Sequence, residues 1–225
     1  MDEKEKRETL ARYDRRLDEF GHDPRTLGWH KRQHLLRYDV LLSHWKLDGA
    51  DLLDFGCGFG DMYAYCQDSG RSGVRYHGLD LNPRLIAEGT KRYPGIDLIA
   101  RDAIVEGLPA TYDVIVASGI FNFRLKDNWG FIARTFAMFA AHSRQGFAVN
   151  FLSNRVDYTE DSLYYADPLK VLDQCYTYSR RVLLRQDYMP FEFTVFVDLR
   201  DSFDKNFTVF PDYQGFIPGM DEEKA

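Results

Sequence analysis

A short apolar stretch that runs directly into alternating glycines constrains this chain more than any other feature. Residues 52–55 read Leu-Leu-Asp-Phe, and glycines follow at positions 56, 58 and 60. Glycine has no Cβ and accepts positive φ, so a turn built from it folds sharply and lets the backbone approach a ligand closely. A buried strand that enters such a turn and continues into a helix is typical of α/β sheets that bind adenosine-containing cofactors. The stretch therefore predicts an α/β fold with a cofactor beside its first core strand.

Length and charge favour a single globular domain that acts on something other than DNA. The chain has 225 residues, of which 44% are hydrophobic and 28% charged, enough for one sizeable core. A formal net charge of -6 disfavours a broad phosphate-binding surface, so no DNA partner is expected. The three cysteines form no Cys-x-x-Cys pair, which fits a reducing compartment and argues against a metal site. The first residues are charged and no run approaches the roughly 18 apolar residues of a membrane span, so we expect a cytoplasmic protein.

Acidic residues follow the next two predicted strands where a cofactor-binding sheet would use them. Residues 74–79 read as a strand that ends at Asp80, and residues 96–100 as a strand followed by Asp102. The glycine spacing places the third glycine one residue earlier than the dinucleotide-binding pattern does. With Asp54 two positions before the first glycine, this order resembles that of class I S-adenosylmethionine (SAM)-dependent methyltransferases, over about residues 50–200.

The resemblance implies a fold and a division of the chain. We expect a Rossmann-like, seven-stranded, mostly parallel sheet with helices on both faces, a helical cover at the N-terminus and a β-hairpin at the C-terminus. Residues 181–185 and 192–198 read as the hairpin strands. The division is a helical cap at 1–48, a methyltransferase core at 49–200 and a tail at 201–225.

The resemblance also implies the cofactor, SAM, and the residues that hold it. Asp80 is expected to accept hydrogen bonds from the ribose hydroxyls, and Asp102 from the exocyclic amine of adenine. The end of the fourth strand, at residues 118–119, is expected beside the methyl group. The core residues expected at the cofactor are Gly56, Cys57, Gly58, Asp80, Leu81, Asp102, Ala103, Ser118 and Gly119.

Two helices are predicted before the core. Residues 1–20 have apolar side chains at helical spacing and predict an amphipathic covering helix. A second helix is predicted at about 29–45, with Trp29, Gln33 and Arg37 on one face. This face could cover the cofactor, with Trp29 against it and Arg37 pairing the methionine carboxylate, because arginine matches planar anions. The alternative is a solvated face with Trp29 as an anchor, and the sequence leaves both open.

A polar, tyrosine-rich stretch at 152–166 follows the fifth predicted strand and is a candidate lid or acceptor wall. A solvated loop pinned by its aromatic residues is the alternative. The residues expected near the methyl acceptor, from this stretch, the fourth strand end and the first helix, are Tyr13, Phe121, Asn122, Tyr158, Tyr164 and Tyr165.

The implied reaction needs a base only when the acceptor must first lose a proton. His30 and His34 lie on the helix predicted to cover the cofactor and are the candidates, although a histidine in such a place is more often a surface residue. The catalytic residue is therefore left open.

The chain lacks the Asn/Asp-Pro-Pro-aromatic motif of enzymes that methylate the exocyclic amines of DNA bases, and it has no Pro-Cys pair for pyrimidine C5 chemistry. An O- or N-acceptor of small size, such as a sugar-derived or secondary-metabolite precursor, is therefore expected, and residues 13–42 are also similar to uncharacterised bacterial methyltransferases of that kind. An RNA or protein methyltransferase, a non-catalytic SAM-binding subunit and a nicotinamide-dependent oxidoreductase remain alternatives.

The aromatic residues of the tail would suit docking on the body or in a homodimer.

Overall fold

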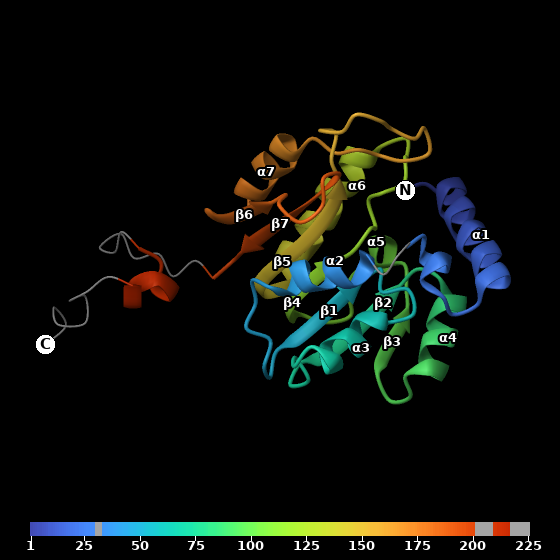
Figure 1. The fold of residues 1–225 in the computed structure, drawn as a ribbon, viewed down its shortest axis with the longest axis horizontal. Coiled ribbons are helices and arrows are strands. Elements are labelled where there is room, and N and C mark those ends of the chain that lie inside the picture. The colour runs from blue at the N-terminus through green and yellow to red at the C-terminus, as the bar shows by residue number, and fades with distance from the viewer. Residues whose placement is uncertain (30–32, 201–208, 217–225) are drawn as a thin grey trace, which may run out of the picture.

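The computed structural model describes residues 1–29, 33–200 and 209–216. Figure 1 shows a twisted central sheet with helices packed against it. The helices are α1 (Glu3–Phe20), α2 (Gln33–Leu42), α3 (Asp61–Asp68), α4 (Pro83–Arg92), α5 (Ala103–Glu106), α6 (Asn128–His142), α7 (Pro168–Tyr176) and the 3-10 turns η1 (Pro24–Leu27) and η2 (Pro211–Phe216). The strands are β1 (Asp51–Phe55), β2 (Arg75–Asp80), β3 (Asp97–Ala100), β4 (Tyr112–Ala117), β5 (Ser143–Leu152), β6 (Arg181–Arg185) and β7 (Glu192–Asp198).

The seven strands form one sheet in the order β3-β2-β1-β4-β5-β7-β6. β7 runs antiparallel to both of its neighbours, β5 and β6, while the other neighbouring pairs are parallel. The predicted Rossmann-like, mostly parallel sheet with a closing hairpin is therefore confirmed. β1 and β4 lie side by side although they are far apart in the chain, and sheets of this kind bind ligands outside the carboxyl ends of the strands at such a point.

The core has one layer on each face of the sheet. Leu53, Ile115 and Val149 point to the face covered by α6 and α7, where Phe136 and Val171 pack against them. The opposite face packs against α2 and α3, and residues from all three elements form a second buried cluster. Strands buried on both faces read as nearly continuous apolar runs, as β4 and β5 do. None of the helices in the described ranges is long and apolar enough to cross a bilayer.

The helical cover lies across one edge of this sheet. α1 begins with a capping box in which Asp2 accepts hydrogen bonds from the amides of Lys4 and Glu5, and it spans the residues predicted for it. Leu17 of α1 packs on Phe59 and Leu85, so the helix lies against the glycine turn and α4 (Figure 1).

The second helix is shorter than predicted. Within the described residues it runs from Gln33 to Leu42, whereas the sequence suggested about 29–45. Its C-terminal end comes early because the amides of Ser43 and Trp45 donate to carbonyls three residues back, which tightens the chain into a turn.

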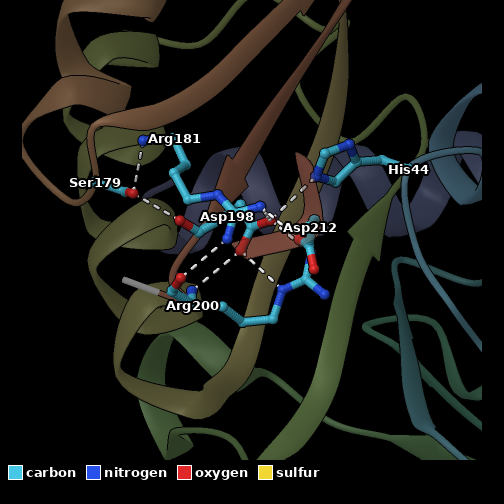
Figure 2. Close-up of polar contacts among 6 residues, drawn as sticks. All are labelled: His44, Ser179, Arg181, Asp198, Arg200 and Asp212. Carbon is cyan, nitrogen blue, oxygen red and sulfur yellow. Dashed lines mark hydrogen bonds and ion pairs between the residues drawn. The ribbon is translucent and has the colours of Figure 1, made fainter. Parts of the chain in front are cut away.

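The far end of β7 carries a polar cluster. The buried carboxylate of Asp198 accepts from His44 at 3.3 Å and from Arg200 at 2.6 Å, and lies 3.3 Å from Arg181 (Figure 2). Arg181 also reaches Asp212 of η2 at 2.7 Å. This cluster joins the turn after α2, both hairpin strands and the tail segment.

Candidate functional site

A cavity of about 570 Å³ opens at the carboxyl ends of the central strands. Its lining includes the glycine turn after β1, the ends of β2 and β4, and residues of α1 and α2. Residues 153–166, here called the covering segment, supply a further wall. They are held by bridges between Phe123 and Leu163 and between Ser153 and Ala166. The sheet therefore provides a floor, and α1 and the covering segment enclose the space above it.

The turn after β1 requires glycine, both for its backbone conformation and for lack of space. Gly56 and Gly58 have φ of 77° and 58°. A Cβ on Gly56 would collide with Ile120, and one on Gly58 would lie 2.8 Å from Leu27. The amides of Gly56 and Cys57 both donate to the carbonyl of Leu79, at 2.7 and 3.1 Å. The turn is thus fixed against β2 with its backbone exposed to the cavity.

Asp80 holds the turn and faces the cavity. Its two carboxylate oxygens accept from the amides of Gly58 and Asn82, each at 2.8 Å, which leaves lone pairs for a ligand. Burial raises its pKa, against these backbone hydrogen bonds. Leu81 lines the cavity next to it.

Asp54, on the floor, accepts from the hydroxyl of Tyr76 at 2.7 Å. Burial raises the pKa of Asp54 to about 7, and the neighbouring charges of Asp80 and Asp61 act in the same direction. A cationic ligand would favour the ionised form of this carboxyl.

Asp102 and Ala103 also line the cavity. Lys6 of α1 forms an ion pair with Asp102 at 2.7 Å. The first helix therefore contacts the predicted adenine position directly, a contact that periodicity alone did not indicate.

The loop after β4 presents unsatisfied polar atoms. Gly119 donates its amide to Asn150 at 2.8 Å, which fixes the loop on β5. Ser118 Oγ and Asn122 Oδ1 are buried in the cavity lining without a hydrogen-bond partner in the described part of the chain. Buried polar atoms are nearly always paired, so these two mark places for a ligand or water.

Trp29, Gln33 and Arg37 all line the cavity; Gln33 and Arg37 lie on α2, whereas Trp29 lies before the described start of that helix. The Arg37 guanidinium lies 4.3 Å from the centre of the Trp29 ring. Its Nε and Nη2 atoms donate to the buried carboxylate of Glu192, with Nε 2.7 Å from Oε2. Nη1 has no hydrogen-bond partner among the described residues, so one edge of the guanidinium remains for a ligand.

Three sequence-predicted site residues lie elsewhere. Phe121 is buried in the core and stacks on Phe151, with ring centroids 5.1 Å apart, because the chain turns its ring under α6. Tyr164 packs against the same core while its amide donates to Asn122. His34 packs edge-on against Tyr38. None of the three is part of the cavity lining, which corrects the expectation that Phe121 and Tyr164 contact the acceptor; His34, a candidate base, does not line the cavity either.

His30, the other candidate base, lies outside the described residues. The acceptor candidates that do line the cavity are Tyr13, Asn122, Tyr158 and Tyr165. Burial and the nearby Asp80 raise the pKa of Tyr13 to about 12, so its phenol stays protonated.

Sequence reasoning missed the charged residues that close the site. Arg12 and Arg16 of α1 line the cavity, as do Glu160 of the covering segment and Glu192 of β7. The two arginines share the helical face of Tyr13, so the spacing of residues 9, 12, 13 and 16 was the available signal. Nothing local pointed to Glu192.

Comparison of the sequence with known proteins identifies related methyltransferases. Residues 53–142 match a family model described as a methyltransferase domain. The chain is 37% identical over 160 residues to Rv1506c of Mycobacterium tuberculosis, a protein named as a methyltransferase, and the match covers 67% of this chain and 93% of the relative.

Solved structures agree at the level of the fold. Magnesium protoporphyrin IX methyltransferase from Synechocystis PCC 6803, with bound SAH (S-adenosylhomocysteine), superposes with a TM-score of 0.59 at 12% identity, covering 84% of this chain and 93% of that one. The SAM-bound amino pentose methyltransferase CalS10 from Micromonospora echinaspora gives a TM-score of 0.54 at 16% identity, covering 74% and 89%. At these identities the likeness shows a shared fold.

Proposed function

Because the chain belongs to the class I SAM-dependent methyltransferases, we propose that it transfers the methyl group of SAM to an oxygen or nitrogen atom of a small molecule. The observation that carries the proposal is a single cavity. In it the glycine turn, the acids after β2 and β3 and the unpartnered atoms after β4 face one another.

The residues present fit SAM. The turn at Gly56 and Gly58 has no room for side chains and leaves its backbone open, as close approach of a cofactor requires. The remaining lone pairs of Asp80 accept hydrogen bonds from the ribose hydroxyls. Asp102 and Ala103 bind the adenine. Cys57 and Leu81 supply apolar contact beside them.

Charged side chains of the cavity complement the amino-acid end of the cofactor. The carboxylates of Asp54 and Asp80 attract its positive charges. Nη1 of Arg37 is free to donate to its carboxylate, and Glu192 holds the guanidinium in position for this role. Arg37 thus serves both Glu192 and the cofactor, each through a different edge of its guanidinium.

When bound, SAM would supply an activated methyl group for transfer to a lone pair of the acceptor, which would release its proton to water or a base. Ser118 and Gly119 line this position, and Asn122 orients the acceptor through its unpartnered Oδ1. The chain contributes alignment and exclusion of water, for which α1 and the covering segment enclose the site.

A small acceptor is supported by this enclosure. Tyr13, Tyr158 and Tyr165 supply aromatic surface to the same space, as small-molecule sites commonly do. A macromolecular acceptor would need a broad groove beside Ser118; the walls that α1 and the covering segment add to the cavity favour a small acceptor instead.

The proposal is tested by following SAH production from SAM by the purified protein with three sets of acceptors: metabolite mixtures, RNA and protein. We expect the metabolite fraction to accelerate SAH release and the macromolecular fractions to leave it at the background rate. Acceleration by RNA or protein alone would contradict the small-molecule assignment, and no acceleration by any set would contradict the catalytic one.

A further inference from the structure

One face of α1 turns two arginines into the cavity. Thr9, Arg12, Tyr13 and Arg16 are spaced i, i+3, i+4, i+7 and all line it. This spacing places them on a single helical face. The helix therefore brings two guanidinium groups, one turn apart, to the enclosed space.

Arg12 is held in place but is not neutralised. Its guanidinium lies 3.9 Å from the centre of the Phe123 ring, just after the β4 loop. Its Nη1 atom is buried and has no hydrogen-bond partner in the described ranges. Stacking on an aromatic face fixes a guanidinium while leaving its donor edges available.

Arg16 lies on the same wall, one turn further along. A Cβ on Gly28 would be only 2.9 Å from Arg16 Nη1, so the absence of a side chain at Gly28 makes room for the guanidinium. Neither Arg12 nor Arg16 forms an ion pair with a carboxylate of the described residues.

Other basic groups around the cavity have partners. Lys6 pairs with Asp102, and Arg37 pairs with Glu192. Like charges placed close together in an enclosed space repel, and they are stabilised when an anion binds between them. Glu160 is the carboxylate of the covering segment that lines the cavity, and it is exposed.

We propose, building on the function above, that the methyl acceptor carries an oxyanion group, a carboxylate or a phosphate, which binds between Arg12 and Arg16. Guanidinium groups match both anions through paired hydrogen bonds. Anchored there, the acceptor extends past Phe123 toward Ser118 and Asn122, where its nucleophile meets the methyl group. Arg37 remains for the carboxylate of the cofactor.

The test uses the full-length protein saturated with SAH and matched probes measured by calorimetry. Benzoate is compared with benzamide, and phenyl phosphate with phenol, so that each pair differs in charge but little in shape. We expect the anionic member of at least one pair to bind more tightly. Whichever anion binds better identifies the class as carboxylate or phosphate.

Variants assign the effect to the two arginines. The double variant Arg12→Gln/Arg16→Gln should weaken binding of the preferred anion by roughly tenfold or more, since charge-assisted hydrogen bonds are lost. Arg15→Gln is the matched control, because Arg15 lies on the same helix, is exposed and does not line the cavity. Glu160→Gln removes a negative charge from the lining and should strengthen anion binding.

Two results would overturn the inference while leaving the methyltransferase assignment intact. The first is SAH binding without any preference for the anionic probes, or with a preference that the double variant retains. The second is a double variant that binds SAH no better than 5′-methylthioadenosine, which lacks the amino-acid end, because the arginines would then hold the cofactor. Failure of the unmodified protein to bind SAH would instead refute the proposed function and the inference together.

Discussion

The two ends of β7 carry buried carboxylates in very different surroundings. Glu192, at the end next to the cavity, is 0% exposed and pairs with Arg37, while the amide of Asn150 donates to it at 3.3 Å. Asp198, at the other end, is 2% exposed and meets His44, Arg181 and Arg200 (Figure 2). One strand thus joins two charge clusters that look alike in composition.

The two clusters differ in how many of their polar atoms have hydrogen-bond partners. Around Asp198, the amide of Arg200 donates to the carboxylate and the hydroxyl of Ser179 donates to the backbone carbonyl of Asp198. In the cavity that Glu192 lines, Nη1 of Arg37, Oγ of Ser118 and Oδ1 of Asn122 have no partner within the described residues. A buried polar cluster that satisfies itself anchors the fold, whereas one with capacity left over marks a binding site.

The acids of the two regions also titrate in opposite directions. At the cavity, burial raises the pKa values of Asp54 and Asp80. At the far end, hydrogen bonds from His44 and Arg200 outweigh burial and lower the pKa of Asp198. A positively charged ligand beside Asp54 and Asp80 would favour the ionised forms of these two carboxyls.

The largest effect is expected from removing Glu192. Glu192→Ala leaves the Arg37 guanidinium buried without its counter-charge, and breaking a buried pair in this way costs about 3–5 kcal/mol of the free energy of unfolding. Urea denaturation followed by circular dichroism measures it. The double variant Glu192→Leu/Arg37→Met should recover most of the loss, and a single variant as stable as the parent would show that the pair is not needed.

A smaller loss is expected at the other end of the strand. Asp198→Asn removes charge-assisted hydrogen bonds and should lower the free energy of unfolding by about 2 kcal/mol at neutral pH. Because the folded pKa lies below the ordinary value of 3.8, this stabilisation is present above pH 4 and is lost as the pH falls through the folded pKa. The difference between parent and variant should shrink in acid, and a constant difference would argue against the charged state.

Asp54 should show the reverse dependence. Its folded pKa of about 7 exceeds the ordinary 3.8, so the folded state binds the extra proton and stability falls as the pH rises between these values. The decrease between pH 6 and pH 7 is about 1 kcal/mol for a single group. Melting temperatures across this range should flatten in Asp54→Asn, and parallel curves for the two proteins would refute the shift.

The smallest loss of stability is expected from Asp212, the exposed member of the polar cluster around Asp198. Asp212 contacts Arg181 from a side chain that is 44% exposed, and pairs of this kind contribute about 0.5 kcal/mol or less. Asp212→Asn should therefore leave the urea midpoint almost unchanged. A large loss would mean that η2 is an integral part of the folded core.

The fold and the floor of the site were accessible from the sequence because they depend on short-range signals. The glycine turn, the acid that ends β2 and the Asn-Pro start of α4 each determine local backbone geometry. Parallel strand order then brings their ends together. For this reason Asp80 and Asp102 could be predicted to face the same ligand.

The walls of the site depended on tertiary contacts that no local pattern encodes. Glu192 meets Arg37 across 155 residues of chain, and only the reversed direction of β7 brings it there. Phe121 reads as a loop residue near the acceptor, but it is drawn into a stack of phenylalanines. The arginines of α1 were hidden because a covering helix with one polar face resembles any solvated helix.

The most direct test of the central claim, that this cavity binds the cofactor, is calorimetric titration of the parent protein, Asp80→Asn and Asp212→Asn with SAH, with NADH as the unrelated nucleotide. The parent and Asp212→Asn should bind SAH with equal affinity, and neither should bind NADH. Asp80→Asn should bind SAH roughly ten- to hundredfold more weakly, since hydrogen bonds to a charged group are lost. Equal SAH binding by a folded Asp80→Asn, or no binding by the parent, would contradict the account.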